Sequence, residues 1–268
     1  MNVIQGVLLG ALALSTTTWR LPQTAEVRDH GPRTYRFTVD YTSTNVRGDV
    51  VHRQRVVGDY TRGLPHGDAT WSHVTLAAAP GATGDLPAGE PRAFMDGLTY
   101  RVSGPDRADV MAAEFFRNFP ADAVLERNLV WDTVMIEGFG QSYFAELALN
   151  RPLHVLPGQN VAMPGVGTFQ NRDIELTWTG RSLRNGRDCA VIDYTALMNP
   201  FEIANGGMTM QARSHYWGQI WVSLADRQIE YATLYEVIAG EMTLPGATSA
   251  QPIHVLRRGV FAPVEAGR

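Results

Sequence analysis

The residues best able to do chemistry are few and scattered in this sequence of 268 residues. None of the 7 histidines has the HxH or HExxH spacing that places two metal ligands on one face. A single cysteine, Cys189, excludes an intramolecular disulfide, a CxxC redox pair and a zinc site made of thiolates. There is no GxSxG elbow and no complete dinucleotide-binding glycine motif. We therefore predict no catalytic residues, no metal site and no cofactor.

The charged residues exclude further classes of function. All 23 basic residues are arginine, which excludes a Schiff-base lysine and the lysine of a P-loop. The net charge of −4 and the absence of a basic run argue against nucleic acid as a partner. No local spacing of acidic residues marks a catalytic carboxylate pair, although distant residues can form one in three dimensions. A hydrolase with a dispersed site therefore stays open as a second alternative.

The N-terminal segment indicates a membrane. An apolar run from Val3 to Leu14, broken by Gln5, has the length of a signal-peptide core and is too short for a standard transmembrane helix. No convincing cleavage site follows it. We predict a signal or a retained membrane anchor over residues 1–20, with an ordinary buried strand or helix as the alternative. The expected anchor residues are Val3, Ile4, Val7, Leu8, Leu9, Leu12, Leu14 and Trp19.

The chain after the anchor is expected on the extracytoplasmic, periplasmic side of the cell envelope. Arg20 follows the apolar run, and the positive-inside rule therefore argues against export. Long domains, however, translocate largely regardless of charge. Residues 21–33 are polar and irregular, which is typical of a linker.

The remaining chain predicts a mainly β fold of α+β class. Alternating segments at residues 35–41, 50–57 and 69–78 indicate strands, and Asp96-Gly97 indicates a tight hairpin. Met111, Phe115 and Phe119 recur at helical spacing after Pro105, which predicts a central helix.

The segment after that helix predicts a short second helix over 121–127 and a strand over 129–136. The Gly/Pro-rich stretch 152–167 divides an N-terminal unit, 34–151, from a C-terminal hairpin unit, 152–268. We expect the two units to be continuous in one large antiparallel sheet, curved or half-barrel in shape, built of hairpins.

Two hairpins are expected in the C-terminal unit. Asn185-Gly186 predicts a type I′ turn, and residues 215–224 and 229–237 form the arms of a longer hairpin. Pairing Leu224 with Ile229 places Gly218 opposite Tyr235, so that an aromatic ring covers the glycine.

This register places Trp217, Trp221 and Leu234 on one half-apolar face, which is the candidate binding face. Packing beneath the Met111/Phe115 helix, contact with a partner protein, and lining of an apolar cavity are its three interpretations.

Three tracts carry a resemblance to known proteins. Residues 172–180, 189–194 and 214–224 resemble uncharacterised bacterial exported β-proteins, over roughly residues 170 to 240. This resemblance implies no activity. The expected large curved sheet of hairpins also resembles periplasmic lipoprotein-carrier half-barrels, an analogy of fold that does not establish function.

These observations favour a non-catalytic structural or accessory subunit, attached to the membrane and bound to a partner protein in a membrane complex. The alternative is an extracytoplasmic carrier or binding protein for a lipid or another apolar ligand.

Overall fold

One open antiparallel sheet dominates the described structure. The computed structural model describes residues 19–22, 27–163 and 165–264. In this part of the chain 13 strands join one sheet, in the order β4-β3-β2-β1-β13-β12-β11-β10-β8-β7, with β5 on β3 and β6 on β9 beside β10. The strands are β1 (Arg33–Thr44), β2 (Val50–Leu64), β3 (Asp68–Pro80), β4 (Glu90–Pro91), β5 (Thr99–Arg101), β6 (Pro152–Val155), β7 (Gln159–Met163), β8 (Gly167–Asn171), β9 (Ile174–Arg184), β10 (Arg187–Asn205), β11 (Met208–Ser223), β12 (Ile229–Thr243) and β13 (Gln251–Pro263).

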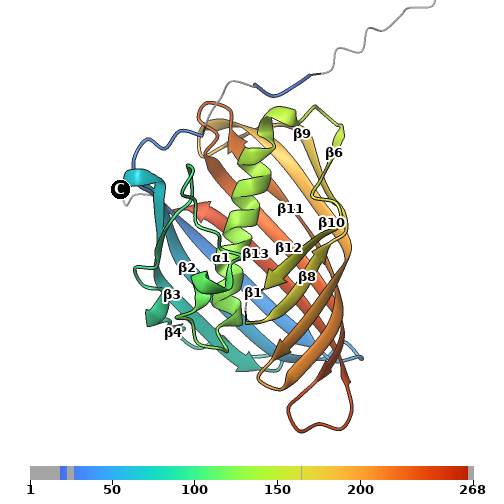
Figure 1. Cartoon of the computed structure of the whole chain (residues 1–268). Coiled ribbons are helices and arrows are strands. Elements are labelled where there is room, and N and C mark those ends of the chain that lie inside the picture. The colour runs from blue at the N-terminus through green and yellow to red at the C-terminus, as the bar shows by residue number, and fades with distance from the viewer. Residues whose placement is uncertain (1–18, 23–26, 164, 265–268) are drawn as a thin grey trace, which may run out of the picture.

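The sheet curves around one helix, α1 (Val124–Glu137), which lies in its hollow (Figure 1). Strand β1 pairs with β13, so the N-terminal and C-terminal units share the sheet. The predicted fold class, a mainly β chain with a large curved antiparallel sheet and a central helix, is therefore confirmed. None of the described helices combines the length and the apolar character needed to cross a bilayer.

The two predicted tight turns differ in outcome. Asn185 and Gly186 both have positive φ, 50° and 72°, and Arg184 pairs with Arg187 across them, so this hairpin is confirmed. The predicted hairpin at Asp96-Gly97 is not formed, so that prediction is wrong. Asp96 has a φ of −67° and Gly97 one of 75°, and both β4 and β5 pair with β3 instead of each other. The dipeptide therefore forms a different turn, in which only the glycine needs positive φ.

The predicted helices also need correction. The segment around Met111 contains only a short 3-10 turn, Ala113–Phe116. Asp109 accepts a hydrogen bond from the backbone N–H of Met111 at 3.0 Å, a local bond that competes with a helix. The residues predicted as a short helix followed by a strand instead form α1. Charged side chains of α1 are buried, so the apolar periodicity that would identify a helix is interrupted.

The register of the β11–β12 hairpin differs by one residue from the predicted one. Gly218 pairs with Leu234 and Trp217 with Tyr235, because the register shifts between Trp221 and Val222. Glu230 is the extra residue of this β-bulge, and its buried carboxylate accepts two hydrogen bonds from Arg33, at 2.9 and 2.6 Å. A slip of one residue exchanges the two faces of a strand. Leu234 therefore lies on the opposite face from the two tryptophans.

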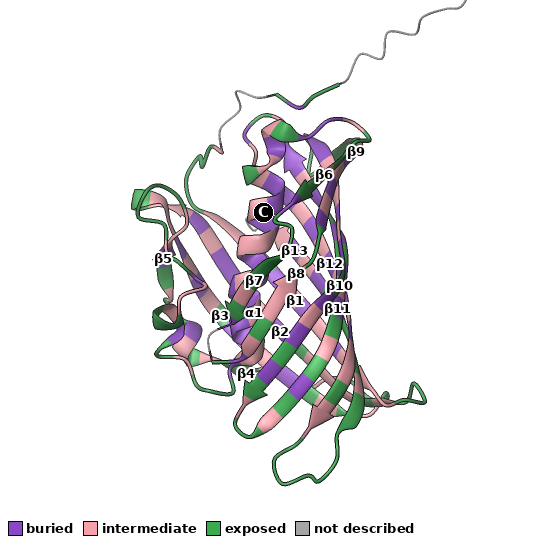
Figure 2. Cartoon of the chain, turned by 45° about the vertical axis from the view of Figure 1, so that its right-hand side comes forward, coloured by how far each residue is buried: buried purple, intermediate pink, exposed green. Residues whose placement is uncertain are grey.

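Buried residues alternate with more exposed ones along the strands of the sheet and also occur along the helix (Figure 2). They form two apolar clusters. The larger cluster extends from β1 and β2 across to β9–β13 and includes α1 residues such as Leu129 and Ile136. The smaller one contains Met163, Val166, Phe201, Ile203, Met210 and Ile238.

Gly218 is required by close packing at the centre of the sheet. It pairs with Tyr194 of β10, whose hydroxyl donates to the carbonyl of Thr233 at 2.8 Å, so Tyr194 covers the glycine in place of the predicted Tyr235. A Cβ at position 218 would lie 2.0 Å from the Thr233 carbonyl oxygen and 2.6 Å from the Tyr194 hydroxyl.

We expect Gly218→Ala to lower the free energy of unfolding by about 1–3 kcal/mol or more, because backbone atoms must move. Chemical denaturation measures the change. The matched control is Gly138→Ala, at a helical position where an added Cβ meets nothing within 4 Å. The control is expected to be neutral or stabilising by about 0.4–1 kcal/mol. Equal effects of the two substitutions would contradict the packing described.

Candidate functional site

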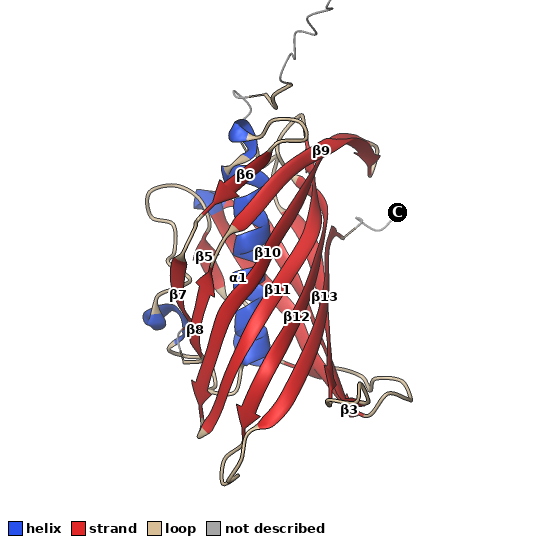
Figure 3. Ribbon diagram, turned by 90° about the vertical axis from the view of Figure 1, so that its right-hand side faces the viewer, coloured by secondary structure: helices blue, strands red, loops and turns tan. Residues whose placement is uncertain are grey.

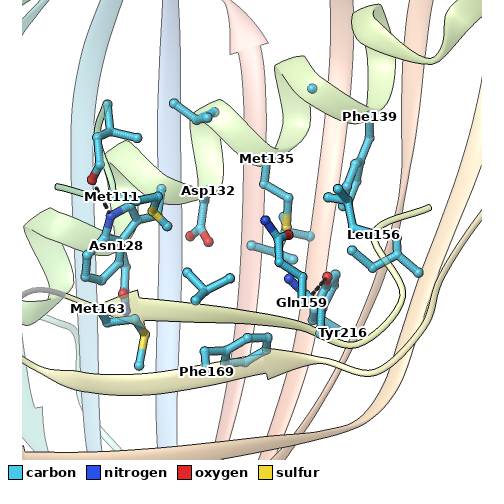
Figure 4. Close-up of a pocket in the computed structure, with 18 of the residues that line it drawn as sticks. Met111, Asn128, Asp132, Met135, Phe139, Leu156, Gln159, Met163, Phe169 and Tyr216 are labelled. Atoms are coloured by element: carbon cyan, nitrogen blue, oxygen red, sulfur yellow. Dashed lines mark hydrogen bonds between the residues drawn. The ribbon is translucent and has the colours of Figure 1, made fainter. Parts of the chain in front are cut away.

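A cavity of about 430 Å³ lies between α1 and the hollow of the sheet. The helix forms one wall, and side chains of β7–β13 form the other (Figure 4). Protein interiors contain few voids larger than a water molecule. The volume is instead in the range of small-molecule sites, about 300–1,000 Å³. The cavity is therefore the candidate site.

One face of α1 and the turn after it line the cavity. The lining positions recur every three or four residues, as one face of a helix requires. They are Asn128, Trp131, Asp132, Val134, Met135, Gly138, Phe139 and Ser142. The turn Gly138–Ser142 has π-helical geometry, and Gly140 within it approaches the sheet so closely that a Cβ would lie 3.1 Å from Ile220. This close approach lets Phe139 reach the end of the cavity.

The sheet side of the cavity is mostly apolar. Met163 of β7, Phe169 of β8, Phe201 of β10 and Leu234 of β12 contribute to it. Met163 and Phe201 belong to the smaller apolar cluster, whereas Leu234 belongs to the larger one. The cavity is thus lined by members of both clusters and lies where they fail to close on each other.

The rim of the cavity includes exposed residues, which connect it to solvent. The exposed lining residues include Leu156 in the turn before β7, Gln159 at the start of β7, and Arg107. Leu156 has a φ of 51°, a left-handed conformation that is unusual for leucine. Strained backbone of this kind is found at ligand-binding sites more often than elsewhere. In the described structure β7 pairs with β8 alone, and β8 reaches β10 through only Phe201–Ile203.

Ion pairs fix the position of the cavity helix. Each of three buried carboxylates on α1 binds an arginine from elsewhere in the fold. These pairs are Glu126 with Arg92, Asp132 with Arg257 of β13, and Glu137 with Arg62 of β2. The Arg62–Glu137 contact is 2.6 Å long, and Tyr60 also donates a hydrogen bond to Glu137. Removing one partner of a buried pair leaves an uncompensated charge, which typically costs about 3–5 kcal/mol.

The central pair is part of a buried polar cluster in the cavity wall. Arg257 donates from one terminal nitrogen to Asp132 and from the other to Glu236 of β12. Ser214 of β11 donates to the second oxygen of Glu236. The guanidinium also lies over the ring of Tyr41, 5.0 Å from its centroid. Asp132, Glu236 and Arg257 all line the cavity.

Burial raises the pKa of the Asp132 carboxyl to about 6. The Arg257 guanidinium opposes this rise and the Glu236 carboxylate adds to it. Although burial favours a lower pKa for Arg257, its interactions with Asp132, Tyr41 and Glu236 raise its pKa well above the ordinary value. The arginine therefore remains charged, while Asp132 changes its charge near neutral pH.

The predicted binding residues do not form one site. Leu234 is buried and lines the cavity, whereas Trp217 and Trp221 lie on the outer face of the sheet, which Figure 3 shows in front of α1. On that face Trp217 stacks on Tyr235 and Trp221 packs against Tyr231. The predicted grouping of the three is wrong, because the bulge at Glu230 changes the register.

Trp19, the last predicted anchor residue, is exposed, and its carbonyl accepts a hydrogen bond from the Leu149 N–H. The predicted anchor residues from Val3 to Leu14 lie outside the described residues. Within the predicted linker, Leu21 is buried in the larger apolar cluster and Asp29 pairs with Arg62.

Other reactive side chains form no comparable site. Burial, together with Glu230, raises the pKa of the Cys189 thiol to about 11, so the thiol stays protonated at neutral pH. Among the described residues no three histidine, cysteine or acidic side chains are grouped to hold a metal ion. The residues of the cavity were missed in the sequence because they come from distant segments. The spacing of Asn128, Trp131, Asp132 and Met135 was the available signal.

No protein-family model and no curated protein matches this chain, in agreement with a resemblance that brings no characterised family. Among solved structures, a structure of lipid–protein interactions in lipovitellin is similar with 13% identity and a TM-score of 0.45. The match covers 88% of this chain but 25% of the lipovitellin chain, so this chain spans a quarter of that protein.

An exported protein with a YmcC-like fold from Bacteroides fragilis is similar with 8% identity and a TM-score of 0.17, over 87% of this chain and 97% of the other. Neither likeness is close enough to support an argument about function.

The raised pKa of Asp132 should make the folding stability of the protein depend on pH. A carboxyl whose pKa rises on folding contributes its full stability below its ordinary pKa of 3.8, and this contribution is lost as the pH rises through about 6. The free energy of unfolding of Asp132→Asn, relative to the wild type, should therefore increase by up to about 3 kcal/mol between about pH 4 and about pH 8.

Urea unfolding curves across this range measure the difference. Asp85→Asn, which neutralises an exposed carboxyl, shows the effect of losing a charge alone. A difference between Asp132→Asn and wild type that does not change with pH would contradict the described burial of Asp132.

Proposed function

We propose that this protein is a binding or carrier protein for a lipid or another apolar small molecule, held in the cavity between α1 and the sheet. The observation that carries the proposal is the cavity itself, about 430 Å³ in volume and lined mostly by apolar side chains of the helix, of the segment before it and of strands β7–β12. Large apolar pockets with a few polar groups are the usual form of small-molecule sites. The buried polar cluster supplies those polar groups.

The composition of the lining supports an aliphatic or otherwise flexible ligand. Met111, Met135 and Met163 line the cavity together with Phe139 and Phe169. Methionine side chains are flexible and polarizable, so they adapt to ligands of irregular shape. The charged residues of the lining are Arg107, Asp132, Glu236 and Arg257, and most of the remaining lining is apolar, which suits a hydrocarbon chain.

We further propose that this binding protein acts at the cell envelope. The apolar N-terminal run supports an extracytoplasmic protein attached to the membrane through residues 1–20. A carrier of apolar molecules at that place would exchange its ligand with the adjacent membrane. Fractionation of the full chain and of a chain lacking residues 1–20 separates attachment from a cleaved signal.

A substitution that fills the cavity tests the binding function. We expect Met135→Trp to lower the affinity for Nile red, a neutral apolar fluorophore, by about tenfold or more, because the indole occupies the ligand volume. Fluorescence titration of the full-length protein measures the affinity. Val161→Trp, on the opposite wall, provides a second filled variant if the first fails to fold.

Trp217→Ala is the matched control, since it changes an aromatic residue on the outer face and should leave the affinity within about twofold. Wild-type protein that does not bind the fluorophore, or filled variants that bind it unchanged, would overturn the proposed function.

A second candidate function is that of an accessory subunit bound to a membrane protein, and the outer aromatic residues favour it. Trp217 is 40% exposed, and the Arg184 guanidinium lies 3.8 Å from the ring centroid of Tyr231. Exposed tryptophan, tyrosine and arginine are the residues enriched in binding hot spots. This face is separate from the cavity, so the two functions are independent.

Trp221→Ala separates a contact surface from internal packing. A partner surface predicts a loss of folding stability below about 1 kcal/mol, together with weaker co-purification after gentle detergent extraction. Thermal melting and co-purification are measured on the same variant. A loss of about 3–5 kcal/mol in stability with normal association would contradict the partner surface.

A further inference from the structure

We infer that the ligand is an amphiphile whose polar head donates hydrogen bonds, a long-chain amine or alcohol rather than a fatty acid, with its head bound at Asp132. This inference rests on the proposed function and specifies the chemical class of the ligand. It follows from which atoms the buried cluster uses internally and which atom it leaves for a ligand.

The Asp132 carboxylate extends from α1 into the cavity (Figure 4). Only Oδ2 is used by the protein, as the acceptor from Arg257. Within the described part of the chain no hydrogen bond reaches Oδ1. The residue is 8% exposed, and Oδ1 keeps a small accessible surface, unlike the fully buried Nε of Arg257. Oδ1 can therefore accept a hydrogen bond from a ligand, and the low polarity of the surroundings strengthens such a bond.

The other charged groups of the cluster offer nothing comparable to a ligand. Both oxygens of Glu236 accept hydrogen bonds, one from Ser214 and one from Arg257. Both terminal nitrogens of Arg257 donate to carboxylates, and its Nε is fully buried, so a ligand cannot reach it. The cluster therefore offers the ligand an acceptor and no cationic donor.

The charge balance points in the same direction. Asp132 and Glu236 carry two negative charges when ionised, against one positive charge on Arg257. Three tyrosines face the cluster, Tyr41 from β1, Tyr194 from β10 and Tyr216 from β11, and burial raises the pKa of each, so they stay neutral. A carboxylate head would meet net negative charge at low dielectric, whereas an ammonium head would be stabilised.

The polar neighbourhood of Asp132 suits a small head. Asn128 lies one helical turn earlier and also lines the cavity, with its amide nitrogen 3.5 Å from the Tyr41 hydroxyl. Beyond Asp132 the helix continues with Met135 and Phe139, which would contact the hydrocarbon chain. Arg107 lies exposed at the rim, and among the described lining residues it offers an anionic head an accessible guanidinium.

The test compares three amphiphiles with the same alkyl chain on the full-length protein. Dodecylamine, dodecan-1-ol and dodecanoate are titrated as competitors of Nile red at about pH 8, where the amine is charged. We expect the amine to bind most tightly, the alcohol next, and the carboxylate at least about tenfold more weakly than the amine.

Asp132→Asn should weaken amine binding by about tenfold and leave alcohol binding within about twofold, because the amide keeps an acceptor but loses the charge. The matched control, Arg117→Gln, removes an exposed arginine that does not line the cavity, and it should preserve the order of the three competitors. If Asp132→Asn fails to fold, the order measured on the wild type still decides the question.

The outcomes separate the inference from the function on which it rests. If Nile red and all three amphiphiles fail to bind, the proposed function is overturned and the inference with it. If they bind but dodecanoate equals or exceeds the amine, or if Asp132→Asn leaves the amine affinity unchanged, only the inference is overturned. Loss of dodecanoate binding in Arg107→Gln would then place an anionic head at the rim.

Discussion

The structure depends on the neutralisation of three carboxylates on one buried helix. Glu126, Asp132 and Glu137 would each be too costly to bury as isolated charges, so each must meet an arginine. Because those arginines come from β2, from β13 and from the segment after β4, the helix can satisfy all three only in one position across the sheet. A purely apolar helix face would tolerate sliding and rotation, whereas these pairs do not.

This fixed position explains why a cavity persists in an otherwise packed interior. Apolar side chains tend to close a void, and the helix would have to move toward β7 and β8 to do so. Such a movement would separate Asp132 from Arg257 and Glu137 from Arg62. The cost of breaking a buried pair, about 3–5 kcal/mol, opposes the collapse. The cavity therefore has one wall held by electrostatics and another formed by a small hairpin with few ladder contacts.

The buried cluster also gives the cavity its chemical character. The pairs at Glu126 and Glu137 lie away from the cavity lining, whereas the pair at Asp132 is part of it. The same interaction that positions the helix therefore places a carboxylate oxygen in an apolar surrounding. In such surroundings a single hydrogen bond or charge discriminates strongly between ligands.

Local sequence signals predicted local structure such as turns and hairpins. They failed where contacts between residues far apart in the sequence determine the structure. The Asn185-Gly186 turn and the long C-terminal hairpins follow from residue types within a few positions. The one-residue slip between β11 and β12 depends on Glu230, whose buried carboxylate is held by Arg33 from the other end of the chain. No local pattern contains that information.

The helix α1 was not predicted correctly, for a related reason. Val130, Thr133, Val134 and Ile136 are β-branched, so the segment has the composition of a strand. Its charged residues fall on the buried side, where an amphipathic helix is expected to be apolar. The arginines of β2, of β13 and of the segment after β4 make that arrangement stable. The candidate site follows from the same long-range pairs, so residue spacing alone could only place its helix members, such as Asn128, Trp131 and Asp132, on one face. Leu234 was predicted, but for another surface.

Photo-crosslinking tests the central claim most directly. A long-chain diazirine alcohol is equilibrated with the full-length protein and irradiated, and the modified residues are located by mass spectrometry. We expect modification of cavity residues such as Met135, Phe139 and Phe169, and competition by unlabelled dodecan-1-ol. Modification confined to the outer face around Trp217 and Trp221, or unaffected by the competitor, would contradict a ligand site between the helix and the sheet.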